Sequence, residues 1–115
     1  EARVDLPFDL QNMAQKVRSM LKRSLDALVN RDDKLARQVC EDDDAVDDLN
    51  REMYGCVAQA IKKDPDNLNS YIQLLSASRY LERMADHATN IAEDVIYLVT
   101  GEIIRHGSNS EEAGF

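Results

Sequence analysis

Two pairs of acidic residues with the same spacing could act together as metal ligands. Asp43 and Asp47 form one pair, and Glu82 and Asp86 form the other. In an α-helix, a spacing of four places both side chains on one face, about one turn apart. Carboxylate oxygens are ligands for cations such as Mg, Mn, Fe and Zn. Two helices that carry these pairs and pack together would make a patch of four carboxylates.

Both pairs interrupt a row of inward-facing residues. Asp43 occupies the inward position between Val39 and Val46, and Glu82 occupies the equivalent position in the later row. An unpaired buried carboxylate costs several kcal/mol, so protonation, basic partners or bound cations must compensate. Four negative charges favour more than one metal ion in a bridged cluster. Asn90 continues the second row and could add a neutral carbonyl oxygen.

The carboxylates also have a simpler interpretation as a hydrated surface. Acidic residues number 22 in a chain of 115, so acid pairs at this spacing also arise by chance. Asp44 and Asp48 form such a pair, and we interpret it as chance. Arg79 and Arg83 flank Glu82 and could simply neutralise it.

Two other side chains near the acids could be ligands. His87 follows Asp86, although a solvated histidine is the commoner outcome at such a position. Cys40 lies near Asp43, but we expect a reduced core thiol there, as for Cys56. Two thiols without metal-finger spacing favour a reducing, cytoplasmic location.

The composition indicates one soluble helical domain. The chain has 115 residues, of which 43% are apolar and 31% charged, and it contains four Gly and two Pro. So few breakers favour long helices. The net charge of -8 argues against a nucleic-acid partner and against adsorption to an anionic membrane. No apolar run approaches the roughly 20 residues that span a bilayer, so we expect no membrane insertion.

Apolar residues recur every three or four positions and predict three helices. We expect them at residues 8–30, 34–63 and 66–99 or beyond, with Gly101 or Gly107 ending the third. Short connections make sequential helices antiparallel, and nothing alternates with the period of a strand. The predicted fold is all-α, an elongated antiparallel three-helix bundle. The core stripe predicted for the first helix is Leu10, Met13, Val17, Met20, Leu21, Leu25 and Leu28.

The connections and the C-terminal end have sequence signals of their own. Asp32 or Asp33 can cap the second helix by accepting backbone N–H groups. Asp64 followed by Pro65 suits a helix start. We expect residues 1–106 to form the bundle and residues 107–115 to form a flexible polar tail.

Several stretches closely resemble the PhoU family of bacterial phosphate-signalling accessory proteins, and together they cover most of the chain. The stretch in the third helix is the most specific, and the order of the stretches also matches. They are SLDALVNRD (24–32), VCEDDDAVDDL (39–49), RYLERMADHATNIAEDVIYLVTG (79–101) and IRH (104–106).

The resemblance implies a metal site. PhoU proteins usually contain two three-helix repeats, each with two E/D-x-x-x-D motifs, and several members bind multinuclear metal clusters through them. Carried over by motif, the ligands here are Asp43, Asp47, Glu82 and Asp86, and Asn90 continues their stripe. The expected cofactor is a cluster of metal ions such as Fe, Zn, Ni, Mn or Mg.

The resemblance also implies a regulatory role without catalysis. PhoU-like proteins negatively regulate the phosphate starvation response and couple the ATP-binding subunit of the phosphate ABC transporter to a sensor histidine kinase. This chain has one repeat, similar to the C-terminal one, and begins with Glu rather than Met. It is therefore either a fragment or a single-repeat member that pairs as a homodimer through an apolar helix face, as we predict.

Three other functions compete with this interpretation. A ferritin-like di-iron site needs Glu-x-x-His, whereas Met84 lies three residues before His87 and Ile103 three before His106. A histidine phosphotransfer domain would use His87, yet the Lys and Gly usual after that histidine are absent. A structural bundle without any ligand is the third alternative.

Overall fold

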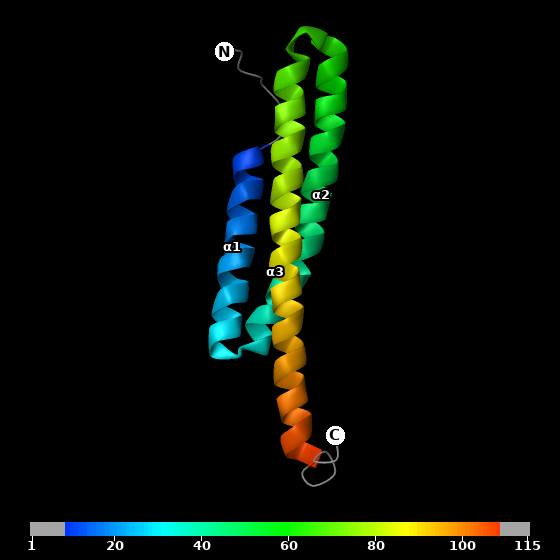
Figure 1. Ribbon diagram of the computed structural model, residues 1–115. Coiled ribbons are helices and arrows are strands. Elements are labelled where there is room, and N and C mark those ends of the chain that lie inside the picture. Colours follow the sequence, from blue (N-terminus) through cyan, green and yellow to red (C-terminus); the bar gives the residue numbers. More distant parts are fainter. Residues whose placement is uncertain (1–8, 109–115) are drawn as a thin grey trace.

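The computed structural model describes residues 9–108, with side chains described to residue 101, as three long helices (Figure 1). Helix α1 spans Leu10–Asn30, α2 spans Asp33–Lys63 and α3 spans Leu68–Ser108, with a short 3-10 helix η1 at Pro65–Asn67. Residues 9–108 contain no strand. The molecule measures 68 × 20 × 17 Å. The predicted elongated antiparallel three-helix bundle is therefore confirmed.

Aspartate side chains fix the starts of the first two helices. The carboxylate of Asp9 accepts the backbone N–H of Asn12 at 3.0 Å. Helix α1 ends at Asn30 and is capped by Arg31, whose φ of 52° is left-handed and turns the chain sharply. Asp32 follows at once and accepts the N–H of Leu35 at 3.1 Å. Of the two predicted caps for the second helix, Asp32 is the one used.

The second turn is built around Asp64. Its carboxylate accepts hydrogen bonds from Asn67 Nδ2 at 2.7 Å and from the Tyr71 hydroxyl at 3.2 Å. It does not cap a backbone N–H of η1, although Pro65 opens that helix as expected. The third helix consequently begins at residue 68 rather than at residue 66.

Helix α3 ends close to the second of the two predicted positions, Gly107, and not at the first, Gly101. Helix α3 passes through Gly101 and ends at Ser108, one residue after Gly107. A glycine stops a helix when it adopts a left-handed conformation, and no glycine in the described residues has a positive φ. The predicted tail lies outside the described residues from position 109 onward. No helix within residues 9–108 is apolar enough over a sufficient length to cross a membrane.

Small residues allow the three helices to pack closely. The prediction of Met13, Val17 and Met20 as core residues is correct, but Leu25 and Leu28 are 51% and 43% exposed. The buried side chains at that end of α1 are Ser24 and Ala27, and the Ser24 hydroxyl donates to the Leu21 carbonyl at 2.8 Å. Helix α3 presents four fully buried small residues to the other helices: Ser78, Ala85, Ala88 and Ala92.

Helices α2 and α3 extend past the start of α1 as a two-helix hairpin (Figure 1). Met53, Val57 and Tyr71 form a separate small core there. The central and lower parts of α3 pack against both other helices around the main core. The four acids of interest therefore lie in the part of the bundle where α3 packs against both α1 and α2, rather than against α2 alone.

Candidate metal centre

Four carboxylates lie together along the line where α2 packs against α3. We call this group, Asp43 and Asp47 of α2 with Glu82 and Asp86 of α3, the α2–α3 seam. Asp43, Asp47 and Glu82 are half-buried, and Asp86 is exposed. Asp43 experiences the charges of Asp47 and Asp86, and Glu82 experiences those of the other three seam acids. The structure thus brings the two acidic pairs within electrostatic range of each other, although Glu82 and Asp86 lie outside the group of described acids whose oxygens come within 4.8 Å of one another.

Burial and mutual repulsion make two seam carboxylates reluctant to ionise. Burial raises the pKa of Asp43 above its usual value, and the charges of Asp47, Asp86 and Asp44 raise this pKa further against an opposing effect of the Thr89 hydroxyl. Burial likewise raises the pKa of Glu82, and Asp47 and Asp86 add to this effect. Both shifts show that the negative charge of the seam is poorly compensated by the protein itself.

No basic side chain within the described residues forms an ion pair with the seam. The ion pairs of this part of the chain join other acids, namely Lys22–Asp26, Arg23–Asp42, Arg37–Asp33 and Arg51–Asp48. The neutralisation of Glu82 by Arg79 or Arg83, considered from the sequence, does not occur there. Protonation or a bound cation is left as the means of compensation.

One seam oxygen has no partner although it is buried. Oδ1 of Asp43 is shielded from solvent and accepts no hydrogen bond. The Thr89 hydroxyl is close enough to the Asp43 carboxylate to lower its pKa by hydrogen bonding, but its best-aligned acceptor is the carbonyl of Ala85 at 3.0 Å. A buried acceptor without a donor costs free energy, and a bound cation would supply the missing charge. The donor set, carboxylates on two facing helices, fits hard or borderline metal ions.

The structure adds Asp44, which sequence reasoning had discounted. One oxygen from each of Asp43, Asp44 and Asp47 lies within 4.8 Å of the other two, although Asp44 itself is exposed. Sequence reasoning considered residues four apart, and adjacent residues on a helix diverge by about 100°. The sequence feature that points to Asp44 is the run of four consecutive acids at positions 41 to 44.

The remaining candidate ligands lie at the edge of the seam. Asn90 and His87 are exposed on α3. Cys40 is half-buried, and its pKa is raised by burial and by the charges of Glu93 and Asp43. A raised pKa keeps the thiol protonated near neutral pH, and the thiolate is the form that binds metals. Cys40 therefore fits a partly buried packing thiol better than a ligand.

Comparisons with known proteins match most of the chain. A family model described as "PhoU domain" matches residues 10–95. The chain is 40% identical over 98 residues to "Phosphate-specific transport system accessory protein PhoU homolog" of Clostridium acetobutylicum, covering 85% of this chain and 45% of that protein.

Further relatives come from an archaeon and from another bacterium. The chain is 33% identical over 94 residues to "Phosphate-specific transport system accessory protein PhoU homolog 1" of Methanothermobacter thermautotrophicus, covering 82% of this chain and 43% of that protein. It is 35% identical over 98 residues to the similarly named homolog of Pseudomonas aeruginosa, covering 85% of this chain and 40% of that protein. The chain thus spans less than half the length of each of these relatives.

Proposed function

The chain belongs to the PhoU family, and from this premise we propose that it is a non-catalytic regulator of phosphate uptake and of phosphate starvation signalling. Its relatives are named as accessory proteins of phosphate-specific transport systems. The proposed partners are the ATP-binding subunit of the phosphate ABC transporter and a sensor histidine kinase at the cytoplasmic face. An elongated helical body with a charged surface supports a role exerted by contact rather than by chemistry.

We further propose that the α2–α3 seam binds a multinuclear metal cluster. The observation that carries this proposal is the buried, unpartnered Oδ1 of Asp43 among carboxylates that no basic residue neutralises within the described part of the chain. Asp43, Asp47, Glu82 and Asp86 are the proposed ligands, with Asn90 as a neutral oxygen donor at the edge. A cation bound there supplies positive charge and links α2 to α3.

Metal content tests the seam directly. Protein purified without a metal-affinity tag should contain one or more equivalents of a transition metal by plasma mass spectrometry. A variant with Asp43→Asn, Asp47→Asn, Glu82→Gln and Asp86→Asn should contain none, because four anionic ligands are replaced by neutral amides. The matched control changes four acids outside the seam: Asp26→Asn, Asp48→Asn, Glu52→Gln and Asp94→Asn. Near-zero metal in all three proteins would leave a hydrated or protonated seam and a plain structural bundle.

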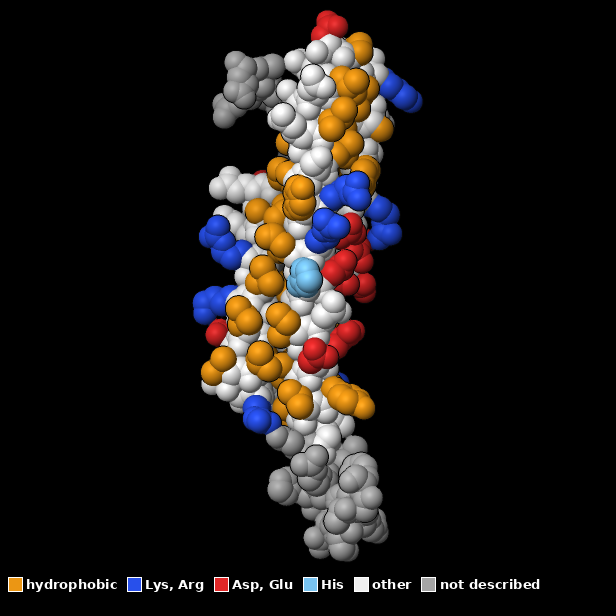
Figure 2. Space-filling view, viewed as in Figure 1, with side chains coloured by type: hydrophobic (Ala, Val, Ile, Leu, Met, Phe, Trp, Pro, Cys, Tyr) orange, Lys and Arg blue, Asp and Glu red, His pale blue; other side chains and the backbone are white. Residues whose placement is uncertain are grey.

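A second surface supports the proposal that the chain pairs with a second copy. Apolar side chains form a band over α1 and α3 on the face shown in Figure 2. We call it the α1–α3 face, and by helical spacing we assign to it four of the exposed apolar residues of these helices, Leu25, Leu28, Met84 and Leu98. Ile91 and Leu21 are half-buried and pack against the main core. An apolar band of this length on an otherwise charged chain is typical of an interaction surface.

Light scattering after size exclusion tests the pairing. The native chain should elute as a dimer at high protein concentration, and Leu25→Glu or Met84→Glu should give monomers, because each places a charge in the proposed apolar contact. Tyr54→Glu is the control, since Tyr54 is 41% exposed but belongs to α2. A native chain that stays monomeric at every concentration would overturn the homodimer and leave the metal proposal intact.

A further inference from the structure

Two arginines on the outer surface of α3 have no partner in the described residues. Arg79 and Arg83 are exposed and one turn apart, and no hydrogen bond or ion pair joins them to any described residue. By contrast, Arg23, Arg37 and Arg51 each bind an aspartate. Acidic residues outnumber basic ones by 22 to 14 in the chain, so a shortage of acids does not explain the unpaired guanidinium groups.

The acid that lies between the two arginines in the sequence is used elsewhere. Glu82 is half-buried in the α2–α3 seam, within hydrogen-bonding reach of the Asp47 side chain. Arg79 and Arg83 are therefore left as like charges separated by four residues, an arrangement that destabilises a helix. An anion that binds both guanidinium groups would remove this repulsion.

Four side chains line a hollow of about 180 Å³ on this surface, namely Ser76, Arg79, Tyr80 and Arg83. Their spacings of three and four residues put all four on adjoining turns of one helix face. Two planar guanidinium groups donate from fixed N–H forks, and two hydroxyls can donate as well. No carboxylate lines the hollow. Such a set suits a tetrahedral oxyanion with several acceptor oxygens.

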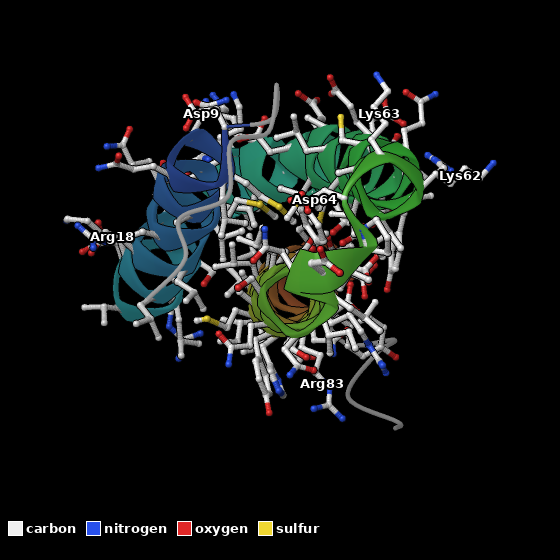
Figure 3. All side chains as sticks on the ribbon, turned by 90° about the horizontal axis from the view of Figure 1, so that it is seen from above. Asp9, Arg18, Lys62, Lys63, Asp64 and Arg83 are labelled. Carbon is white, nitrogen blue, oxygen red and sulfur yellow. The ribbon has the colours of Figure 1, made fainter. Side chains whose placement is uncertain are left out.

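We propose that this hollow, the α3 oxyanion hollow, binds inorganic phosphate. The two arginines match its negative charge, and the hydroxyls of Ser76 and Tyr80 complete the contacts. Arg83 points away from the bundle, where an ion from solvent reaches it freely (Figure 3). The choice of phosphate among tetrahedral oxyanions rests on the proposed phosphate role of the chain. The hollow itself needs no metal.

Nuclear magnetic resonance on the 15N-labelled, metal-free full chain tests this proposal. Titration with sodium phosphate at constant ionic strength, against sodium chloride, should shift amide signals of residues 76–83. Arg79→Gln or Arg83→Gln should each weaken binding by roughly tenfold or more, because a hydrogen bond to a charged group contributes about that much affinity. Because the titration uses metal-free protein, the measured phosphate affinity does not depend on metal binding at the α2–α3 seam.

Arg18→Gln provides the matched control. Arg18 is exposed on α1 and, like Arg83, points away from the bundle (Figure 3). Its replacement should leave phosphate affinity unchanged, and both hollow variants should keep native metal content. Phosphate shifts that match those caused by chloride, or an equal loss of affinity in Arg18→Gln, would overturn the oxyanion site. Absence of metal from the native chain would overturn the metal proposal alone.

Discussion

Replacement of Asp43 by Asn should raise the melting temperature of the metal-free protein and lower that of the metal-loaded protein. Without metal, a buried oxygen of Asp43 has no hydrogen-bond donor, and burial and Asp47 disfavour its negative charge. Asn keeps the shape of the side chain and removes this charge. With metal bound, the same change removes an anionic ligand.

The metal-loaded effect should be the larger of the two. A ligand at 100 times its dissociation constant stabilises a protein by about 2.7 kcal/mol. In a domain of this size, 1 kcal/mol shifts the melting temperature by about 4–8 °C. Metal should therefore raise the native melting temperature by on the order of 10 °C, and Asp43→Asn should lose most of this rise because an anionic ligand is gone.

Thermal melts with chelator and with added Mn²⁺ or Zn²⁺ provide the measurement. Asp48→Asn is the control, because Asp48 is exposed, lies outside the seam and pairs with Arg51. An exposed pair of this kind contributes at most about 1 kcal/mol, with or without metal. A change of the same sign in both states of Asp43→Asn would contradict the metal site.

The pH dependence of the same proteins provides a second measurement of this prediction. The pKa values of Asp43 and Glu82 are raised above the ordinary 3.8 and 4.5 in the folded chain. Their contribution to stability is present below the ordinary pKa and is lost as pH rises through the folded pKa. The advantage of Asp43→Asn without metal should therefore shrink as pH falls through that window. Acid should weaken the metal-loaded protein, since protons and metal ions compete for the same oxygens.

The sequence predicts the helices well but not how each helix is rotated. Periodicity located all three, and Asp32 was a predictable cap because capping depends on residues close in sequence. In α1, the buried residues after Met20 are Ser24 and Ala27. Leu25, which the sequence predicts to be buried, is exposed. Hydrophobicity alone predicts that the leucine is the residue that faces the core. Close packing on the buried alanines of α3 favours the smaller side chains.

The position of the α2–α3 seam was predictable from the sequence, but the contacts of the side chains around it were not. A spacing of four puts Asp43 beside Asp47 on any α-helix, and antiparallel packing then aligns two such pairs. No sequence pattern says that Glu82 leaves Arg79 and Arg83 without a partner, because that depends on the rotamers of long side chains. Asp44 was missed for a similar reason. Its carboxylate approaches Asp43 through side-chain orientation rather than through helical spacing.

The three lines along which the helices meet differ in chemistry, so each surface can be tested alone. The α2–α3 seam is acidic, and the α1–α3 face is apolar. Between α1 and α2, Arg23 binds Asp42 beside a polar hollow of about 290 Å³ that Lys16 also lines. Loss of metal tests the α2–α3 seam and loss of pairing tests the α1–α3 face, whereas loss of phosphate binding tests the α3 oxyanion hollow, which is lined by α3 alone.

Enlargement of Ala85 to Leu should destabilise the fold and weaken metal binding without touching a ligand. Ala85 is fully buried on α3, in the turn that joins Glu82 to Asp86. Extra methyl and methylene groups in a packed core cost about 1–3 kcal/mol, which lowers the melting temperature by roughly 4–8 °C per kcal/mol. Ala85 belongs to the core cluster shared by all three helices, so we expect the added volume to move α3 relative to α2, separate the two acidic pairs and lower the affinity for metal.

Metal titration of folded Ala85→Leu, with helicity checked by circular dichroism, separates these two effects. Ala77→Leu serves as the control, because Ala77 lies on the same helix but is only half-buried. It should keep native metal affinity and nearly native stability. If Ala85→Leu melts earlier but binds metal as tightly as the native chain, the spacing of α2 and α3 does not set the site. The ligands would then adapt by side-chain rotation alone.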